Sequence, residues 1–264
     1  GRPVPEGDTV WLACLRLNAA LGGQRITRSE LRVPQLAGTD LVGVTCTEVV
    51  ARGKHQLLRF DTGWTLHTHL RMEGAWRFRR TGERLPGPAD QIRIVLAGAT
   101  HTCVGLRIPV VEMVRTDAED EVVGHLGPDL LDPAFDAAEA VRRIRYHPGR
   151  TIGEALLDQR NLAGIGTLYR AETLFLQGIH PRRPVGEVAD VAAVVERARR
   201  LLEANKLHHD QVTTGVRRRG EEHWVFERPG KPCRRCGTLV VSEEFGPPGQ
   251  ERRSYHCPHC QPGP

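Results

Sequence analysis

The chain has 264 residues, of which 39% are hydrophobic and 26% charged, a balance typical of a globular protein with room for one large domain or two smaller ones. No apolar run approaches the roughly 20 residues of a membrane-spanning helix, and no signal-peptide pattern is present, so we expect a cytoplasmic protein with no membrane partner. The formal net charge of +5 and the dense arginines of the C-terminal region favour a polyanion as partner.

The stretch PEGDTVW, residues 5–11, leads into a predicted helix. Apolar residues recur at spacings of three and four from Val10 to Leu21, the pattern of one buried helix face. Asp8 or Thr9 can cap the start of this helix, and a glycine pair ends it. Taken alone, a proline and a glutamate ahead of such a helix are typical of an ordinary turn.

Between about residues 40 and 107 the apolar pattern changes to a period of two. Short segments rich in β-branched residues and separated by Gly, Pro or Asp predict antiparallel strands: VGVTCTEVV, QLLRF, WTLHTHL and IRIVLA. This arrangement is typical of a β-sandwich or barrel. Three isolated cysteines, Cys14, Cys46 and Cys103, fall in apolar patterns and are predicted to be core residues in a reducing compartment.

The pattern becomes helical after the turn-rich linker HLGPDLLDP, near residue 125. Four helices are predicted, over 137–144, 151–158 and 165–177 and along an apolar stripe from Val191 to Leu202. The second begins with a capping box of Thr151 and Glu154. Residues 206–232 are polar, basic and poorly periodic.

The turn NLAGIG, residues 161–166, joins the second and third of these helices. Its glycines are expected to leave the amides around Gly164 and Gly166 exposed at a helix N-terminus, where an anion such as a DNA phosphate can bind. Asn161 can add a side-chain donor. Helical hairpins of this kind are also common in proteins that bind no nucleic acid.

Four cysteines near the C-terminus form two CxxC pairs separated by twenty residues: Cys233, Cys236, Cys257 and Cys260. This spacing predicts one zinc ion, which is structural because four thiolates leave no open coordination position; disulfides and redox pairs are the alternatives. The segment between the pairs is expected to be a β-hairpin. Arg252 and Arg253 lie just before its return strand, where an arginine suits phosphate clamping.

Five stretches in this order, PEGDTVW, RGKHQLL, HLRMEG, DQRNLAGIGTLYRAE and the CxxC finger, make the chain similar over residues 5–262 to the bacterial formamidopyrimidine-DNA glycosylase and endonuclease VIII family. The resemblance implies a multidomain α and β fold. Its parts are an N-terminal antiparallel β-sandwich with flanking helices (5–124), a helix–two-turn–helix domain (125–228) and a zinc-finger β-hairpin (229–264). It also implies a nucleoid-associated monomer that binds double-stranded DNA containing oxidised bases or abasic sites.

The resemblance assigns the chemistry to the N-terminus. Pro5 matches the nucleophile, whose secondary amine attacks C1′ of a damaged nucleotide, displaces the base and forms an iminium, after which β- and δ-elimination cut the strand. A secondary amine gives a permanently cationic imine that acts as an electron sink. The neighbouring helix N-terminus should disfavour protonation of that amine. Glu6 matches the acid/base carboxylate that moves protons to the ribose oxygen.

The remaining matches are DNA contacts. Lys54, which we group with the catalytic residues, and His69 match phosphate-binding residues, and Met72 matches the wedge that fills the void left by the flipped base. Asn161 matches a turn residue that contacts phosphate. Arg252 matches the finger arginine, with Arg253 as the alternative one position on.

The branch of the family is a separate question. PEGD, and His55 after Lys54, resemble the endonuclease VIII side, which prefers oxidised pyrimidines. The alternatives are the same fold preferring oxidised purines and a non-catalytic, zinc-dependent damaged-DNA-binding protein. Two departures are an acidic Glu73 directly after Met72 and the absence of a clear match to the other intercalating residues of the purine branch.

Pro5 is preceded here by GRPV. An acylated proline nitrogen is an amide whose lone pair is delocalised into the carbonyl, so it cannot attack C1′. We interpret residues 1–4 as a leftover of recombinant expression, with Val4 where the initiator residue would stand. The chain that begins at Pro5 is then expected to be active, and the longer chain to bind DNA without reacting.

Overall fold

A computed structural model describes residues 3–264, so Gly1 and Arg2 of the predicted N-terminal leftover lie outside the described residues. The chain forms two compact units. We call Thr9–His125 the β unit, and the segment ending at Asp8 together with Leu126–Pro264 the helical unit. None of the described helices combines the length and the apolar character needed to cross a bilayer.

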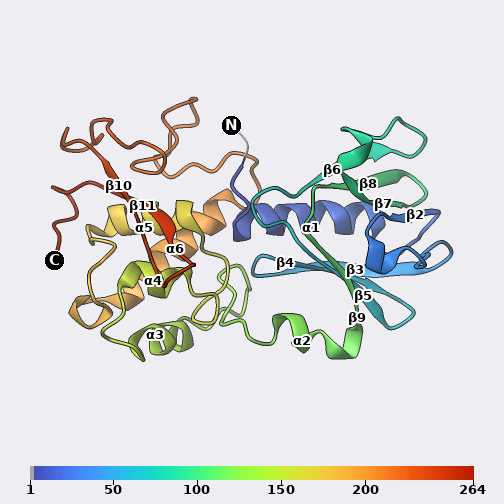
Figure 1. The fold of residues 1–264 in the computed structure, drawn as a ribbon, viewed down its shortest axis with the longest axis horizontal. Helices are drawn as coiled ribbons and strands as arrows, with labels where there is room; N and C mark the ends of the chain where they lie inside the picture. The colour runs from blue at the N-terminus through green and yellow to red at the C-terminus, as the bar shows by residue number, and fades with distance from the viewer. Residues whose placement is uncertain (1–2) are drawn as a thin grey trace. The chain divides into compact units, whose positions relative to one another are not determined.

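The β unit contains two antiparallel sheets, as the alternating pattern predicts (Figure 1). One has the strand order β1-β3-β4-β5-β9 and the other β2-β7-β8-β6. The strands are β1 Gln24–Arg25, β2 Arg28–Leu31, β3 Thr45–Arg52, β4 His55–Phe60, β5 Trp64–His69, β6 Ala75–Arg80, β7 Ile92–Ala97, β8 His101–Leu106 and β9 Val110–Arg115. Short 3-10 turns are η1 Pro34–Leu36, η2 Ala89–Gln91 and η3 Thr116–Ala118, and α2 Asp120–Val123 follows them.

The core of the β unit lies between its sheets and the helix α1 Gly7–Leu21. The helix contributes the predicted stripe, with Val10 and Leu17 almost fully buried. Leu58 and Leu66 from one sheet and Ile94 from the other belong to the same apolar cluster. The helix begins at Gly7, so Asp8 lies in its first turn and does not cap it as predicted. The three isolated cysteines are buried and unpaired, as expected.

The helical unit contains four longer helices, all at predicted positions: α3 Ala137–Arg145, α4 Ile152–Leu157, α5 Thr167–Gln177 and α6 Val191–Asn205, with a 3-10 turn η4 Val185–Glu187. Their ends follow ordinary capping chemistry. The Thr151 hydroxyl accepts from the Glu154 amide at the start of α4, as the predicted capping box requires. Gly178, with φ 67°, closes α5 in the left-handed conformation.

A β-hairpin lies between the cysteine pairs, as expected. It is formed by β10 Val241–Phe245 and β11 Arg252–His256. Arg252 and Arg253 are the first residues of the return strand, whereas the sequence pattern placed them just before it. Residues 206–240 contain neither a helix nor a strand.

Candidate active site and DNA-binding residues

Glu6 is held at the N-terminus of α5. Its carboxylate, in a residue only 1% exposed, accepts from the amides of Gly166 at 2.6 Å, Leu168 at 2.8 Å and Tyr169 at 3.2 Å. Amides in the first turn of a helix have no intrahelical partner, and the residue at the cap position, Gly166, supplies no side chain. Glu6 therefore caps α5 from a point 160 residues away in sequence.

Two glycines make this arrangement possible. The Gly7 amide donates to the Gly164 carbonyl at 2.9 Å, and a Cβ on Gly7 would lie 2.9 Å from the Gly164 Cα. A Cβ on Gly166 would lie 2.7 Å from the Glu6 carboxyl carbon. The glycine of the PEG motif thus allows the start of α1 to lie against the NLAGIG turn.

The expectation that the amides of Gly164 and Gly166 are exposed is wrong. Both residues are buried. The Gly164 amide donates to the side-chain oxygen of Gln159 at 3.0 Å, and the Gly166 amide donates to Glu6. The anion that this helix N-terminus binds is therefore a carboxylate of the protein itself.

A second polar network, which the sequence analysis missed, surrounds the start of the chain. The Tyr169 hydroxyl donates to Asp8 at 2.6 Å, and the Gln211 side-chain amide donates to both Asp8 oxygens at 3.2 and 3.3 Å. Gln211 also accepts from the Val4 amide and donates to the Val4 carbonyl, each at 2.8 Å. These contacts hold Val4, the residue before Pro5, and Asp8, while Pro5 itself is partly exposed.

Asn161 is half-buried and directs a donor inward. Its Nδ2 donates to the Ala155 carbonyl at 3.0 Å. The preceding Arg160 is the exposed residue of this turn, with 71% of its side chain accessible. The turn thus presents a guanidinium next to the amide that the family motif identifies.

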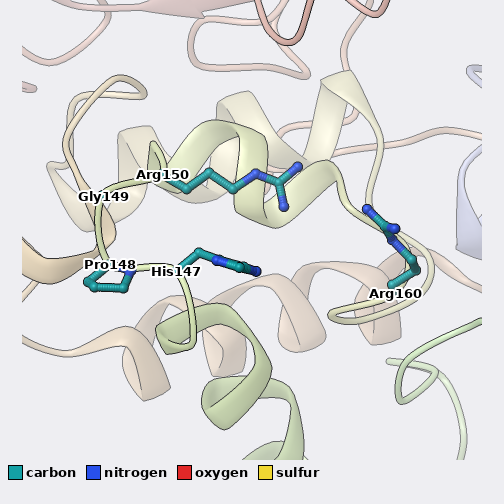
Figure 2. A pocket seen from close by; sticks show the side chains of 5 residues that line it. All are labelled: His147, Pro148, Gly149, Arg150 and Arg160. Carbon is teal, nitrogen blue, oxygen red and sulfur yellow. The ribbon is translucent and has the colours of Figure 1, made fainter.

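Arg160 also lines a cavity of about 540 Å³ together with His147, Pro148, Gly149 and Arg150 (Figure 2). Arg150 and Arg160 both donate to Asp158, at 2.8 Å and at 3.0–3.1 Å. Although burial acts in the opposite direction, these donors lower the pKa of Asp158 to about 2. The pocket lining thus carries two arginines, both of which are ion-paired with Asp158.

Lys54 and His69 lie in the β unit. Lys54 occupies the two-residue turn between β3 and β4, and His69 ends β5, paired across the strands with His55. The Arg71 amide donates to His69 Nδ1 at 3.0 Å, so the neutral ring carries its proton on Nε2, where it can donate to a phosphate. Burial and the charges of Lys54 and Arg71 lower the pKa of His69 to about 4.

A chain of polar side chains extends behind His69. His55 Nδ1 lies 2.8 Å from His67 Nε2, and His67 Nδ1 lies 2.7 Å from the Glu112 carboxylate. Burial, reinforced by the neighbouring histidines and Lys54, lowers the pKa of His55 to about 3. The alternation of His67 and His69 in LHTHL is the signal that could have identified this cluster, because residues two apart on a strand share a face.

Met72 lies at the tip of a tight turn. The Gly74 amide donates to the Leu70 carbonyl at 2.8 Å, and a Cβ on Gly74 would come within 2.8 Å of that oxygen. Arg71 adopts φ 47°, an uncommon conformation for a residue with a side chain. The turn leaves Met72 67% exposed, as the predicted wedge that fills the void of a flipped base would have to be.

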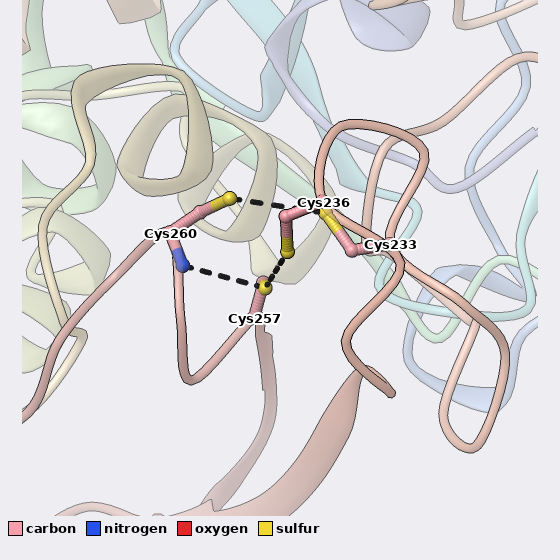
Figure 3. Close-up of side chains that lie close together, drawn as sticks. All are labelled: Cys233, Cys236, Cys257 and Cys260. Atoms are coloured by element: carbon pink, nitrogen blue, oxygen red, sulfur yellow. Dashed lines mark hydrogen bonds between the residues drawn. The ribbon is translucent and has the colours of Figure 1, made fainter.

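The four cysteines gather as their spacing predicts (Figure 3). The sulfurs of Cys233 and Cys260 are 4.0 Å apart, and those of Cys236 and Cys257 are 3.4 Å apart. Tetrahedral Zn–S bonds of about 2.3 Å would place the sulfurs about 3.8 Å apart, so the set fits a metal ion.

A second group, His180, Glu243 and His256, is also close enough to hold a metal. The Arg182 amide donates to His180 Nδ1 at 3.0 Å, which leaves the neutral ring protonated on Nε2, and the Arg182 side chain pairs with Glu243 at 2.9 Å. In this tautomer the His180 ring therefore offers no free lone pair to a metal, whereas Nδ1 of the buried His256 has no hydrogen-bond partner within residues 3–264.

The two finger arginines differ in their partners. Arg253 pairs with Glu244 at 3.2 Å, whereas Arg252 donates to the neighbouring Glu251 carbonyl at 2.9 Å and has no ion pair within residues 3–264. The helical unit brings together Pro5, Glu6 and the NLAGIG turn, and it also contains the cysteines and the hairpin. The β unit contains Lys54 and His69.

Comparisons with known proteins agree with this architecture. A sequence model of the formamidopyrimidine-DNA glycosylase N-terminal domain matches residues 4–108, and one of the H2TH domain of the same enzymes matches residues 126–216. The chain is 50% identical to "Probable endonuclease 8 2" of Streptomyces coelicolor, covering 99% of this chain and 95% of that one. It is 42% identical to "DNA-(apurinic or apyrimidinic site) lyase Nei2" of Mycolicibacterium smegmatis, covering 98% and 99%.

Among solved structures, Lactococcus lactis formamidopyrimidine-DNA glycosylase bound to DNA containing an abasic site superposes with a TM-score of 0.81 over 98% of this chain and 100% of that one, at 22% identity. That likeness shows the fold. The two relatives named above are also similar in sequence, over nearly the whole length of the chain. The chain belongs to the formamidopyrimidine-DNA glycosylase family, among its endonuclease 8 relatives.

Proposed function

We propose that this protein is a bifunctional DNA glycosylase and AP lyase of base excision repair that removes oxidised pyrimidines, with Pro5 as nucleophile. The Pro5 nitrogen forms a bond to C1′ and gives up its proton, and the base leaves with the electron pair of the glycosidic bond. Opening of the C1′–O4′ bond gives the iminium, while O4′ takes up a proton. Loss of a C2′ proton then expels the 3′ phosphate, and δ-elimination releases the 5′ phosphate.

The observation that carries this proposal is the fixed carboxylate next to the proline. Glu6 follows Pro5 directly, accepts hydrogen bonds from three amides and is almost fully buried. Such a carboxylate has little freedom to move, so it can meet the ribose oxygen in one orientation. A carboxylate that served only to cap α5 would not require a partly exposed proline beside it.

The phosphate contacts are proposed from residues in both units. Lys54 provides a cation and His69 a neutral donor, while Asn161 and Arg252 add contacts from the helical unit. Met72 is proposed as the wedge. We propose double-stranded DNA with oxidised or abasic sites as the substrate and a monomer as the working form, acting on the nucleoid in the bacterial cytoplasm.

We propose that the four cysteines bind one zinc ion. Four thiolate ligands would complete its coordination, so the ion would supply folding energy to β10 and β11 and take no part in the reaction. The donor set and the sulfur separations support this assignment. The residues that act on DNA from this element are the arginines of β11.

We propose that the active form begins at Pro5. The Val4 carbonyl, to which the Pro5 nitrogen is bonded as an amide, accepts from both the Glu6 amide and the Gln211 side chain at 2.8 Å. In a chain that starts at Pro5, Gln211 loses these partners and can interact with the free amine.

Borohydride trapping on abasic DNA tests the nucleophile, because only an imine is reduced to a stable adduct. The form beginning at Pro5 should be trapped, and the chain carrying Val4 should bind the same DNA without being trapped. Equal trapping of both forms would exclude Pro5 as the nucleophile. Binding without trapping by either form would support a non-catalytic DNA-binding protein.

The preference for pyrimidines has a separate test. Duplexes carrying a single thymine glycol or a single 8-oxoguanine would be compared under single-turnover conditions. We expect faster release of the oxidised pyrimidine. Faster release of the oxidised purine would overturn the lesion class while leaving the mechanism intact.

A further inference from the structure

Arg170 is one of the largest fully buried side chains among the described residues, and burying its charge is costly in free energy. It lies in the first turn of α5 with 1% exposure. Within residues 3–264 its Nε and Nη1 atoms have no hydrogen-bond partner. Burying a charged group with unpaired donors is unfavourable, and a well-packed apolar side chain in its place is often at least as stable. A side chain buried at such a cost calls for an explanation other than stability.

The contacts of Arg170 connect two parts of the proposed machinery. Its Nη2 donates to the Arg253 carbonyl at 2.9 Å, at the start of β11. Its guanidinium lies 5.2 Å from the ring centre of Phe245, the last residue of β10. The backbone of the same residue belongs to the turn of α5 whose amides clasp Glu6, and its own amide donates to the Gly166 carbonyl at 2.9 Å.

The charge of Arg170 also acts on this site. Burial lowers its pKa to about 10, against the opposing effect of the negative charges of Glu6 and Glu154. The group therefore remains a cation at neutral pH, near the Glu6 carboxylate and near Arg252.

The packing around Phe245 makes room for its ring beneath the Arg170 guanidinium. A Cβ on Gly153 would lie 2.8 Å from the Phe245 ring, so the glycine at the start of α4 makes room for that ring. Arg182 lies over the ring as well, at 4.9 Å. The Phe245 ring thus holds the hairpin together with the Arg182–Glu243 ion pair, and Arg170 joins the ring to α5.

We propose that Arg170 is a positioning residue that ties the finger hairpin to the first turn of α5, so that the hairpin arginines and Glu6 keep a fixed spacing. It does not touch the substrate in this role. The proposal rests on the proposed function, because it assigns the hairpin to DNA binding and Glu6 to the reaction.

Arg170→Met in the form beginning at Pro5 tests the proposal. We expect the trapping rate at saturating abasic DNA to fall about tenfold or more, while the Kd for DNA with a stable abasic analogue changes less than about threefold. The melting temperature should stay the same or rise, because two unpaired donors are removed. Arg199→Met is the matched control: Arg199 also lies over an aromatic ring, at 5.4 Å from Phe135, and the rate should not change.

A second measurement tests the tie itself. Stripping the finger metal should lower the trapping rate of the wild type at saturating DNA. The same treatment of Arg170→Met should lower it by less than about twofold further, because coupled changes are not additive. Phe245→Leu, which removes the ring beneath the guanidinium, should show the same loss of coupling if Arg170→Met is poorly produced.

Three results would overturn the proposal: a wild-type rate in Arg170→Met, additive effects of mutation and metal removal, or a lowered melting temperature with an unchanged rate. Failure of the wild type to be trapped at all would instead refute the proposed function.

Discussion

Replacing Gly166 with alanine tests the Glu6 site most directly. The added Cβ would lie 2.7 Å from the carboxyl carbon of Glu6 and 2.8 Å from its Cγ, closer than such contacts occur, so the Glu6 side chain must move. The backbone of Gly166, at φ −124° and ψ −159°, is extended and suits alanine without strain. The change is therefore a steric displacement of one carboxylate.

The size of the effect follows from the bonds that are lost. A hydrogen bond to a charged group contributes about 1.5–3 kcal/mol, and the bond from the Gly166 amide is the first to be broken. For a chain of this size this corresponds to a fall in melting temperature of roughly 3–12 °C. If Glu6 moves protons in the reaction, the trapping rate should fall by about 10²–10⁴.

The assay is single-turnover borohydride trapping with excess enzyme that begins at Pro5, together with thermal unfolding of the same protein. Gly149→Ala is the control, because a Cβ at Gly149 meets nothing within 4 Å. A Gly166→Ala protein with both the wild-type rate and the wild-type melting temperature would refute the described contact between Gly166 and Glu6.

Three further predictions concern other parts of the molecule. Folding lowers the pKa of His55 to about 3 and that of His69 to about 4, whereas both are about 6.5 in the unfolded chain. Below pH 6.5 the unfolded state therefore binds more protons than the folded state, so the free energy of unfolding falls as the pH drops. Acidification to pH 4.5 should cost about 2–3 kcal/mol per histidine, and denaturant titrations should show about that much less acid sensitivity in His55→Gln. Chelating the finger metal should weaken DNA binding while calorimetry still shows the unfolding transition of the β unit; simultaneous unfolding of both units would contradict a separable finger. Gly7→Ala should slow trapping, because its Cβ would meet the Gly164 backbone at 2.9 Å and neither side can swing away; an unchanged rate would show that this close approach is not needed.

The sequence predicts those parts of the fold that depend on local pattern. The alternation in QLLRF and WTLHTHL identifies β4 and β5, and the apolar stripe of Val10 to Leu21 identifies α1. The short strand β2, with the sequence RSEL, is not predictable from the apolar pattern. Its mostly polar residues form a strand only because they pair with β7, as Arg28 does with Ala97. Pairing partners far apart in sequence leave no periodic signal in either segment.

The residues of the site are predictable from sequence motifs, but their hydrogen-bond partners are not. The motifs identify Pro5 and Glu6 but not what holds them, because the amides that bind Glu6 lie about 160 residues further along the chain. The same amides at Gly166 were expected to meet a phosphate. Both interpretations recognise an anion site at a helix N-terminus, and only the fold decides which anion reaches it.

The polar segment 206–232 shows how order can arise without a pattern. It lacks regular structure, yet the buried carboxylate of Glu172 on α5 accepts from the amides of Trp224 and Val225, at 2.6 and 2.9 Å, and from the Thr213 hydroxyl. These bonds tie two stretches of the segment to the same helix whose N-terminus holds Glu6. The same segment carries Gln211, whose side chain binds Val4 and whose carbonyl lies 2.7 Å from His223 Nε2. The helix α5 thus binds the start of the chain directly, through its amides to Glu6 and the Tyr169 hydroxyl to Asp8, and it also orders the segment that carries Gln211.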